Sequence, residues 1–211
     1  MWKTEKFKYC FKLLVIGDSE TGKSNIIYRI LKNEYKELAY ITMGIKSDYM
    51  SMKVGKDLIS LALFDVSGKE WFRSLSKAYY NKVHGIILVY DITSRKSFEG
   101  MDYWMTDFKN NNLINKALIC LVGNKSDLDR ERVITYEEGR KFAEKNCFCF
   151  CEVSARTGKR IEEMINNVIE ECIEKYKYEQ KKRDMDEIED NKLVPLIPVG
   201  GENTNQQKKK C

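Results

Sequence analysis

The chain has 211 residues, of which 43% are hydrophobic and 33% are charged. This composition can fill one core and solvate its surface, so it excludes a disordered or fibrous chain for most of the length and predicts one domain, or one domain plus a tail. The net charge of +5 includes Lys208, Lys209 and Lys210 near the C-terminus, which leaves the body too weakly basic for a nucleic-acid-binding face.

The sequence lacks the usual signals for export or membrane insertion. No uncharged apolar run approaches the ~18 residues that a membrane-spanning helix needs. Residues 1–17 scatter lysines among apolar residues instead of forming the apolar centre of a signal peptide. We therefore expect a reducing compartment, in which the seven cysteines are free thiols.

Short β-rich runs alternate with amphipathic stretches along the chain. The expected strands are residues 7–16, the more polar 48–54, then 59–64, 86–90, 118–122 and 148–153. Three of them are apolar almost throughout, which is typical of strands covered on both faces of a parallel sheet. Apolar residues at helical spacing predict helices around 98–108, 136–145 and 161–176, the second opened by a capping box of Thr135 and Glu138. This alternation predicts an open α/β sheet with helices on both faces.

A phosphate-binding loop follows the first expected strand. The pattern G-x-x-x-x-G-K-[ST] lies between that strand and a helical run. Backbone N–H groups of such a loop face a polyphosphate, and the helix N-terminus adds the positive end of its dipole. We expect Lys23 to neutralise the β- and γ-phosphates and Ser24 to place its hydroxyl on Mg²⁺. The flanking strand and helix disfavour the alternative of an ordinary glycine turn. The loop residues are Gly17, Asp18, Ser19, Glu20, Thr21, Gly22, Lys23 and Ser24.

Two further motifs lie at the C-terminal ends of expected strands, where α/β sheets bind ligands. In the D-x-x-G motif, Asp65 is expected to reach Mg²⁺ through a water and the Gly68 N–H to sense the γ-phosphate. In the N-K-x-D motif, the Asp127 carboxylate can accept hydrogen bonds from N1–H and the amino group of guanine, whereas adenine offers no matching pair of donors. Asn124 would brace this loop, and the Lys125 stem would cover one face of the base. Either motif alone is a weak signal, but their order after a phosphate loop indicates guanine.

With these three motifs in order, residues from about 7 to 176 resemble the small GTPases of the Ras superfamily, and within them the Rab family. The likeness includes residues 17–19, 73–75, 79–80, 85–93 and 122–125. The resemblance implies a P-loop GTPase domain over residues 1–178, with a six-stranded, mostly parallel sheet and helices on both faces. Residues 179–211 would form a charged helical extension and a flexible membrane-targeting tail.

The resemblance also implies roles for residues outside these motifs. Thr42 would be the switch I threonine that binds Mg²⁺ and the γ-phosphate, and Tyr35 would lie against the guanine. The implied metal set is Ser24, Thr42 and Asp65. The resemblance also implies a third nucleotide-binding loop, in which the Ala155 N–H would donate a hydrogen bond to guanine O6. This loop consists of Ser154, Ala155 and Arg156. Loss of the γ-phosphate would release switch I and the segment after Asp65, and partners would read the difference.

Lys69, next to Gly68, departs from the family pattern where a glutamine orients the attacking water. Glutamine offers a donor and an acceptor, whereas an ammonium has three donors and cannot accept a hydrogen bond from water. Lys69 is therefore a degenerate catalytic position, which predicts little intrinsic hydrolysis and a GTP form that persists. An activating protein that inserts its own glutamine and arginine would restore hydrolysis.

Other departures concern the phosphate loop and the partner surface. Glu20 replaces a glycine of the Rab loop, and its carboxylate is expected to point into water instead of toward the phosphates. Ser47 and Phe64 replace aromatic residues of the surface that Rab effectors read. These changes put the identity of the partners in doubt rather than that of the nucleotide.

The cysteines near residue 150 and the single histidine receive structural interpretations. Cys147, Cys149 and Cys151 alternate with phenylalanines and are expected to share one face of a strand as small core residues. A metal site is disfavoured because a straight strand spreads such ligands over ~13 Å. His84 shows no obvious partner in the sequence, and we assign it no role.

The chain ends with three lysines and Cys211. A terminal thiol beside adjacent cations suits a prenyl group combined with attraction to anionic lipid, the two signals that stable anchoring requires. The alternative is a solubilising tail with an incidental thiol, since Rab termini more often carry two cysteines and this is not a C-a-a-X box.

Three functions agree with these observations to different degrees. The first is a monomeric Rab-like GTPase that binds GTP/GDP and Mg²⁺, cycles between cytosol and the cytoplasmic face of an intracellular membrane, and acts in vesicle transport. Its expected partners are effectors, an exchange factor, a GTPase-activating protein and a GDP-dissociation inhibitor. The second is a GTP-bound scaffold that does not hydrolyse its nucleotide. An ATP-dependent P-loop kinase is disfavoured by Asp127 and by the absence of an evident lid segment.

Overall fold

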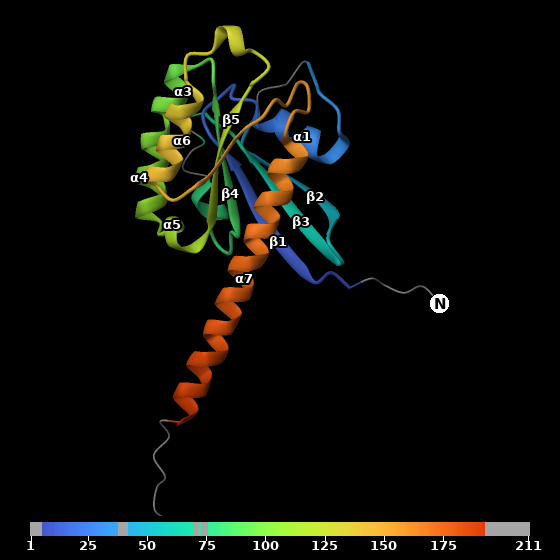
Figure 1. Cartoon of the computed structure of the whole chain (residues 1–211), viewed down its shortest axis with the longest axis vertical. Coiled ribbons are helices and arrows are strands. Elements are labelled where there is room, and N and C mark those ends of the chain that lie inside the picture. Colours follow the sequence, from blue (N-terminus) through green and yellow to red (C-terminus); the bar gives the residue numbers. More distant parts are fainter. Residues whose placement is uncertain (1–5, 38–41, 70–71, 73–75, 193–211) are drawn as a thin grey trace, which may run out of the picture. The chain divides into compact units, whose positions relative to one another are not determined.

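A computed structural model describes the backbone of residues 6–37, 42–69, 72 and 76–192 and the side chains of those up to 185 (Figure 1). The chain divides into two units, Met1–Lys175 and Tyr176–Cys211. What is described of the second unit is the end of helix α7 (Ile161–Lys192). The expected flexible tail and Cys211 lie outside the described residues.

A six-stranded sheet of the order β2-β3-β1-β4-β5-β6 is formed by the described part of the first unit. Five strands run parallel: β1 (Tyr9–Ile16), β3 (Asp57–Val66), β4 (Gly85–Asp91), β5 (Leu118–Asn124) and β6 (Cys149–Glu152). The edge strand β2 (Ile45–Val54) pairs antiparallel with β3 through a hairpin at Gly55 and Lys56. Every residue of β4 is buried, as its apolar run predicts. The expected mostly parallel α/β sheet is therefore confirmed.

Helices cover both faces of the sheet. Successive residues of a strand point to opposite faces, so a strand that is apolar throughout presents apolar side chains to the helices on each face. Leu13 and Val15 of β1 join one apolar cluster, and Leu14 and Ile16 join the other. The first cluster lies under α1 (Lys23–Lys32) and residues 161–175 of α7. The second lies under α4 (Met101–Asn110), α5 (Leu113–Lys116) and α6 (Tyr136–Lys145). These three helices lie together on one side of the sheet in Figure 1.

The helix expected around 98–108 is two helices, α3 (Arg95–Glu99) and α4, which meet at Gly100. A Cβ on Gly100 would lie 2.4 Å from an Asp18 carboxylate oxygen. A larger residue at the junction would therefore displace the Asp18 side chain. By contrast, α6 begins as predicted. The Thr135 hydroxyl accepts a hydrogen bond from Glu138 N at 3.2 Å, and the Glu138 carboxylate accepts one from Thr135 N at 2.9 Å.

One expectation about a single residue is wrong, and one residue that the sequence left without a role has partners in the structure. Cys147 does not share a strand face with Cys149 and Cys151, because it is exposed, has a φ of 56° and lies in the turn before β6. His84 does have partners: its Nδ1 accepts a hydrogen bond from the backbone N–H of Lys12 at 3.0 Å, and its ring contacts Phe11. The histidine thus satisfies backbone groups beside β1.

Burial divides the cysteines into reactive and protected thiols. Cys10 and Cys147 are exposed, whereas Cys120, Cys151 and Cys172 are buried. Burial raises the pKa of the Cys172 thiol to about 12, and only the thiolate reacts with alkylating agents.

At pH 8 we expect a maleimide to label Cys10 and Cys147 within minutes and Cys172 only after unfolding in urea, as measured by mass spectrometry of tryptic peptides. Labelling of folded Cys172 as fast as that of Cys147 would contradict this packing.

Across the described residues, no helix combines the length and the apolar character that crossing a membrane requires.

Candidate nucleotide-binding site

The phosphate loop occupies residues 17–22, between the end of β1 and the start of α1. Gly17 has a φ of +143°, and a Cβ there would lie 2.0 Å from the carbonyl oxygen of Val89. Gly22 has a φ of +90°, and a Cβ there would lie 2.3 Å from the amide nitrogen of Asn124. Both positions therefore require glycine, for the backbone angle and for the close approach. The loop ends at the N-terminus of α1, whose first turn contains no acidic residue and is suited to an anion.

Lys23 is the first residue of α1, and its ammonium group points back into the loop. The residue is 6% exposed, and its Nζ donates a hydrogen bond to the Asp18 carbonyl at 2.6 Å. Burial of an ammonium costs free energy unless a counter-charge or several acceptors offset it. A polyphosphate held by the loop would supply that counter-charge.

Three oxygen-bearing side chains meet beside Lys23 from separate parts of the chain. Ser24 Oγ donates to Asp65 Oδ2 at 2.6 Å and lies 2.9 Å from Thr42 Oγ1. Thr42 Oγ1 donates to the same carboxylate oxygen at 3.2 Å. Asp65 is 4% exposed, and its second oxygen, Oδ1, has no hydrogen-bond partner among the described residues. Hydroxyl and carboxylate oxygens are the ligands that Mg²⁺ prefers, so the set of Ser24, Thr42 and Asp65 fits this ion.

The base-reading loop after β5 is tied directly to the phosphate loop. Asn124 is 2% exposed, and its amide nitrogen donates to the Thr21 carbonyl at 2.8 Å. Its amide oxygen accepts a hydrogen bond from the Ala155 N–H at 3.1 Å. One side chain therefore joins the phosphate loop, the N-K-x-D loop and the 154–156 loop. A guanine O6 that met the Ala155 N–H would share this donor with Asn124.

The carboxylate expected to select guanine is held by a hydroxyl group. Ser154 Oγ donates to Asp127 Oδ1 at 2.5 Å, which fixes the carboxylate orientation. The Lys125 ammonium lies 2.6 Å from the Asp91 carboxylate at the end of β4. This ion pair holds the lysine stem across the loop, so Asp91 is a supporting residue.

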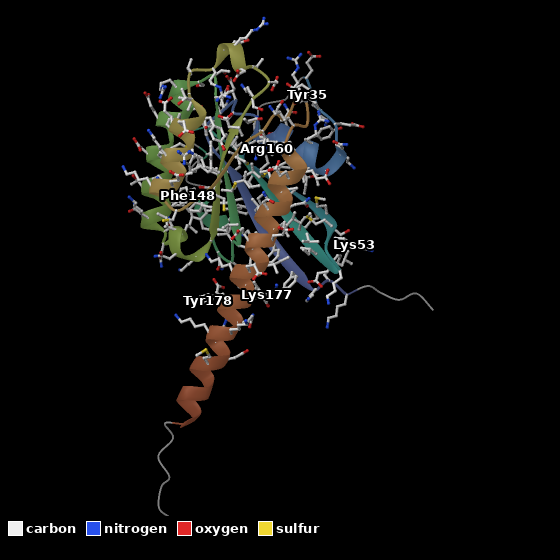
Figure 2. The ribbon with its side chains drawn as sticks, in the orientation of Figure 1. Tyr35, Lys53, Phe148, Arg160, Lys177 and Tyr178 are labelled. Carbon is white, nitrogen blue, oxygen red and sulfur yellow. The ribbon has the colours of Figure 1, made fainter. Side chains whose placement is uncertain are left out.

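Two adjoining hollows run along these loops. One of about 310 Å³ includes Lys23, Ser24, Thr42, Gly68 and Lys69 in its lining. The other, of about 220 Å³, includes Asn124, Asp127, Ala155 and Arg156. Both are lined by Gly22, Asn25, Tyr35 and Lys125. Tyr35 lies at the end of the unit where these loops gather (Figure 2). Together the hollows offer a phosphate end and a base end to one nucleotide.

The segment after Asp65 begins in contact with the phosphate loop. A Cβ on Gly68 would lie 2.3 Å from Ser19 N and from the Asp18 carbonyl carbon. This contact requires glycine and places its neighbour Lys69, which is half-buried, in the lining of the phosphate hollow. The Rab-like residues 73–75 lie outside the described residues.

Glu20 is exposed, in accordance with the expectation of a solvated side chain, but its backbone is strained. Its φ is 67°, in the left-handed region that costs a residue with a Cβ about 1 kcal/mol or more relative to glycine.

We expect Glu20→Gly to raise the free energy of unfolding by about 1 kcal/mol, measured by urea titration. Glu20→Ala is the matched control, because it removes the charge and keeps the Cβ. Equal stabilisation by both variants would assign the effect to charge instead of backbone strain.

A P-loop and an Asn-Lys-x-Asp loop, joined on a six-stranded α/β sheet, define the class of guanine-nucleotide-binding domains.

Comparison with known proteins identifies the family. The model of the Ras family matches residues 12–174. The chain is 39% identical over 159 residues to Ras-related protein Rab-4B of Homo sapiens, covering 75% of this chain and 74% of the relative. It is 36% identical over 165 residues to Ras-related protein RABA1b of Arabidopsis thaliana, covering 78% and 76%. The chain therefore belongs to the Ras family and is a small GTPase of the Rab type, a group that binds GTP and GDP.

Proposed function

We propose that this protein is a Rab-like switch of intracellular membrane transport, which binds GTP or GDP with Mg²⁺ and recruits effectors when GTP is bound. The observation that carries the proposal is the hydrogen bond from Asn124 to Thr21, because it holds the base-reading loop against the phosphate loop. Family membership favours such a switch over a GTP-bound scaffold that never hydrolyses its nucleotide.

Each loop has a defined task in the proposed nucleotide complex. The backbone of residues 17–22 and the Lys23 ammonium would enclose the phosphates, and Asp127 would select guanine. Ser24, Thr42 and Asp65 would hold Mg²⁺, which when bound offsets the charge of the β- and γ-phosphates. Thr42 reaches this set from the segment before β2, so loss of the γ-phosphate would weaken its position.

The proposed effector surface includes parts of β2 and β3. Ser47 is exposed and lies opposite Phe64 in the register of the two strands. The Phe64 ring lies 5.4 Å from the Tyr79 ring, and Lys12 Nζ lies 5.1 Å from the Phe64 ring centroid. A serine in place of an aromatic side chain reduces the apolar area available at this position. The effectors should therefore differ from those that bind an aromatic side chain at the position of Ser47.

Membrane attachment is proposed through a prenyl group on Cys211, assisted by the adjacent Lys208, Lys209 and Lys210. The regulators expected from family membership are an exchange factor, an activating protein and a GDP-dissociation inhibitor. Intact-mass spectrometry of protein purified from its own cells tests the anchor. An unmodified Cys211 in the membrane fraction would contradict it.

The nucleotide assignment is tested by identifying what co-purifies with the protein. We expect denatured, purified protein to release GDP or GTP in a ratio near one per chain, measured by anion-exchange chromatography and mass spectrometry. Release of an adenine nucleotide, or no binding of added GDP in the presence of Mg²⁺, would overturn the proposal.

A further inference from the structure

Arg29, near the C-terminal end of α1, contacts the loop on the base side of the site. Its Nε donates to the Ala155 carbonyl at 3.0 Å, and its Nη2 donates to the Arg156 carbonyl at 2.6 Å. A Cβ on Gly158 would lie 3.7 Å from Cδ, Nε and Cζ of Arg29, so the side chain also packs beside the turn after the loop. Arg29 therefore holds residues that are more than a hundred positions away in the sequence.

The same guanidinium also contacts the start of the segment that carries Tyr35. Its Nη1 donates to the Asn33 carbonyl at 2.7 Å. Asn33 caps α1 in the left-handed conformation, with a φ of 53°, and the chain then turns toward Tyr35, which lines both hollows. One side chain thus joins the segment before Thr42 to the 154–156 loop.

These contacts continue to the phosphate loop through a chain of hydrogen bonds. Ala155 accepts from Arg29 with its carbonyl and donates with its N–H to Asn124. Asn124 in turn donates to Thr21, eight positions before Arg29 in the same loop–helix unit. The neighbouring Ser154 holds the Asp127 carboxylate at 2.5 Å. This series of hydrogen bonds therefore starts and ends on the phosphate loop and helix α1, and it passes through Asn124 and Ala155, which line the base hollow.

The chemistry of these contacts requires arginine. The three acceptors are backbone carbonyls that diverge around one planar group, and the guanidinium presents its N–H donors in a fixed fork. Lysine carries a single ammonium on a flexible stem, so it can reach one or two of these carbonyls at a time. Methionine has similar length and no donor.

We propose that Arg29 is a positioning residue for guanine recognition, which holds the 154–156 loop and thereby sets the Asp127 carboxylate against the base. This inference rests on the proposed guanine-nucleotide function. Arg29 acts through the loop rather than by touching the nucleotide, so its loss should shorten nucleotide residence and also weaken the selection of the base.

The test measures dissociation of GDP and of inosine diphosphate from the full chain with Mg²⁺. Inosine lacks the 2-amino group that Asp127 would bind, so the ratio of the two rates reports the position of the carboxylate. In Arg29→Met we expect GDP to dissociate about tenfold faster and the preference for GDP over inosine diphosphate to fall at least threefold. Arg29→Lys should show an intermediate change in both quantities.

Arg160→Met is the matched control, because Arg160 is exposed at the start of α7 and pairs with Glu163 at 2.9 Å (Figure 2). We expect Arg160→Met to change neither the rate of GDP dissociation nor the preference for GDP over inosine diphosphate by more than twofold. A faster GDP dissociation with an unchanged base preference in Arg29→Met would show a merely structural role and overturn the inference, as would unchanged dissociation. If Arg29→Met does not fold, Arg29→Lys decides on the same criteria. Failure of the wild-type chain to bind GDP would instead refute the proposed function.

Discussion

Replacement of Lys69 by glutamine is expected to raise the single-turnover rate of GTP hydrolysis by about tenfold or more, toward the ~10⁻⁴ per second typical of unassisted family members. Lys69 lies in the lining of the phosphate hollow beside Gly68, so in the proposed nucleotide complex a side chain at this position would lie within reach of a water near the γ-phosphate. The glutamine amide can accept a hydrogen bond from that water while it donates another, which the ammonium cannot do. A tenfold change corresponds to ~1.4 kcal/mol of barrier.

The measurement is phosphate release from protein preloaded with radiolabelled GTP, without an activating protein. Lys69→Met serves as the control, because it removes the charge and supplies no acceptor, and it should remain as slow as the wild type. If Lys69→Met became as fast as Lys69→Gln, the positive charge would be the cause rather than the missing acceptor. If Lys69→Gln hydrolysed GTP no faster than the wild type, the account of this position would be wrong.

Strands were predictable from the sequence where burial decides the residue types. All residues of β4 are buried, so its apolar run marks the strand almost to its ends. The start of β2 at Ile45 could not be predicted as well, because Lys46 and Ser47 at the sheet edge are exposed and show no burial signal. The break between α3 and α4 at Gly100 could not be predicted, because the helical spacing of apolar residues continues across it from Phe98 to Met101.

Within the candidate site, too, some residues could be predicted from the sequence and others could not. Residues within contiguous motifs, such as Lys23 and Asp127, could be identified because one short pattern combines several requirements of nucleotide binding. Asp91 carries only a weak sequence signal, an acidic residue at the end of an apolar strand, and the structure places it beside Asn124, its register partner on β5. Arg29 had no signal, because an arginine on a helix surface is common and its acceptors lie 126 and 127 positions away.

Asp127→Asn is expected to reduce the affinity for GDP by about 100-fold to 1,000-fold and to make xanthosine diphosphate the preferred nucleotide. Guanine presents two donors to the carboxylate, N1–H and the 2-amino group, and hydrogen bonds to a charged acceptor are worth about 1.5–3 kcal/mol each. Xanthine presents N1–H and a carbonyl, which match the acceptor and the donor of a carboxamide. Ser154 Oγ, 2.5 Å from Asp127 Oδ1 in the wild type, can still donate to an amide oxygen and hold the new side chain in place.

Equilibrium titration with fluorescent GDP, in competition with unlabelled xanthosine and inosine diphosphates, measures this exchange of preference. Asp129→Asn is the matched control: its carboxylate is 75% exposed, pairs with Arg132 and lies two residues along the same loop, so the same change of charge should leave every affinity within about twofold. A loss of GDP binding without a gain for xanthosine diphosphate would indicate a collapsed loop, not an altered base contact. Because the hydrogen bond from Asn124 to Thr21 does not involve Asp127, we expect the phosphate end of the site to stay intact in Asp127→Asn. A gain in affinity for xanthosine diphosphate is therefore the result that would place the base at residue 127.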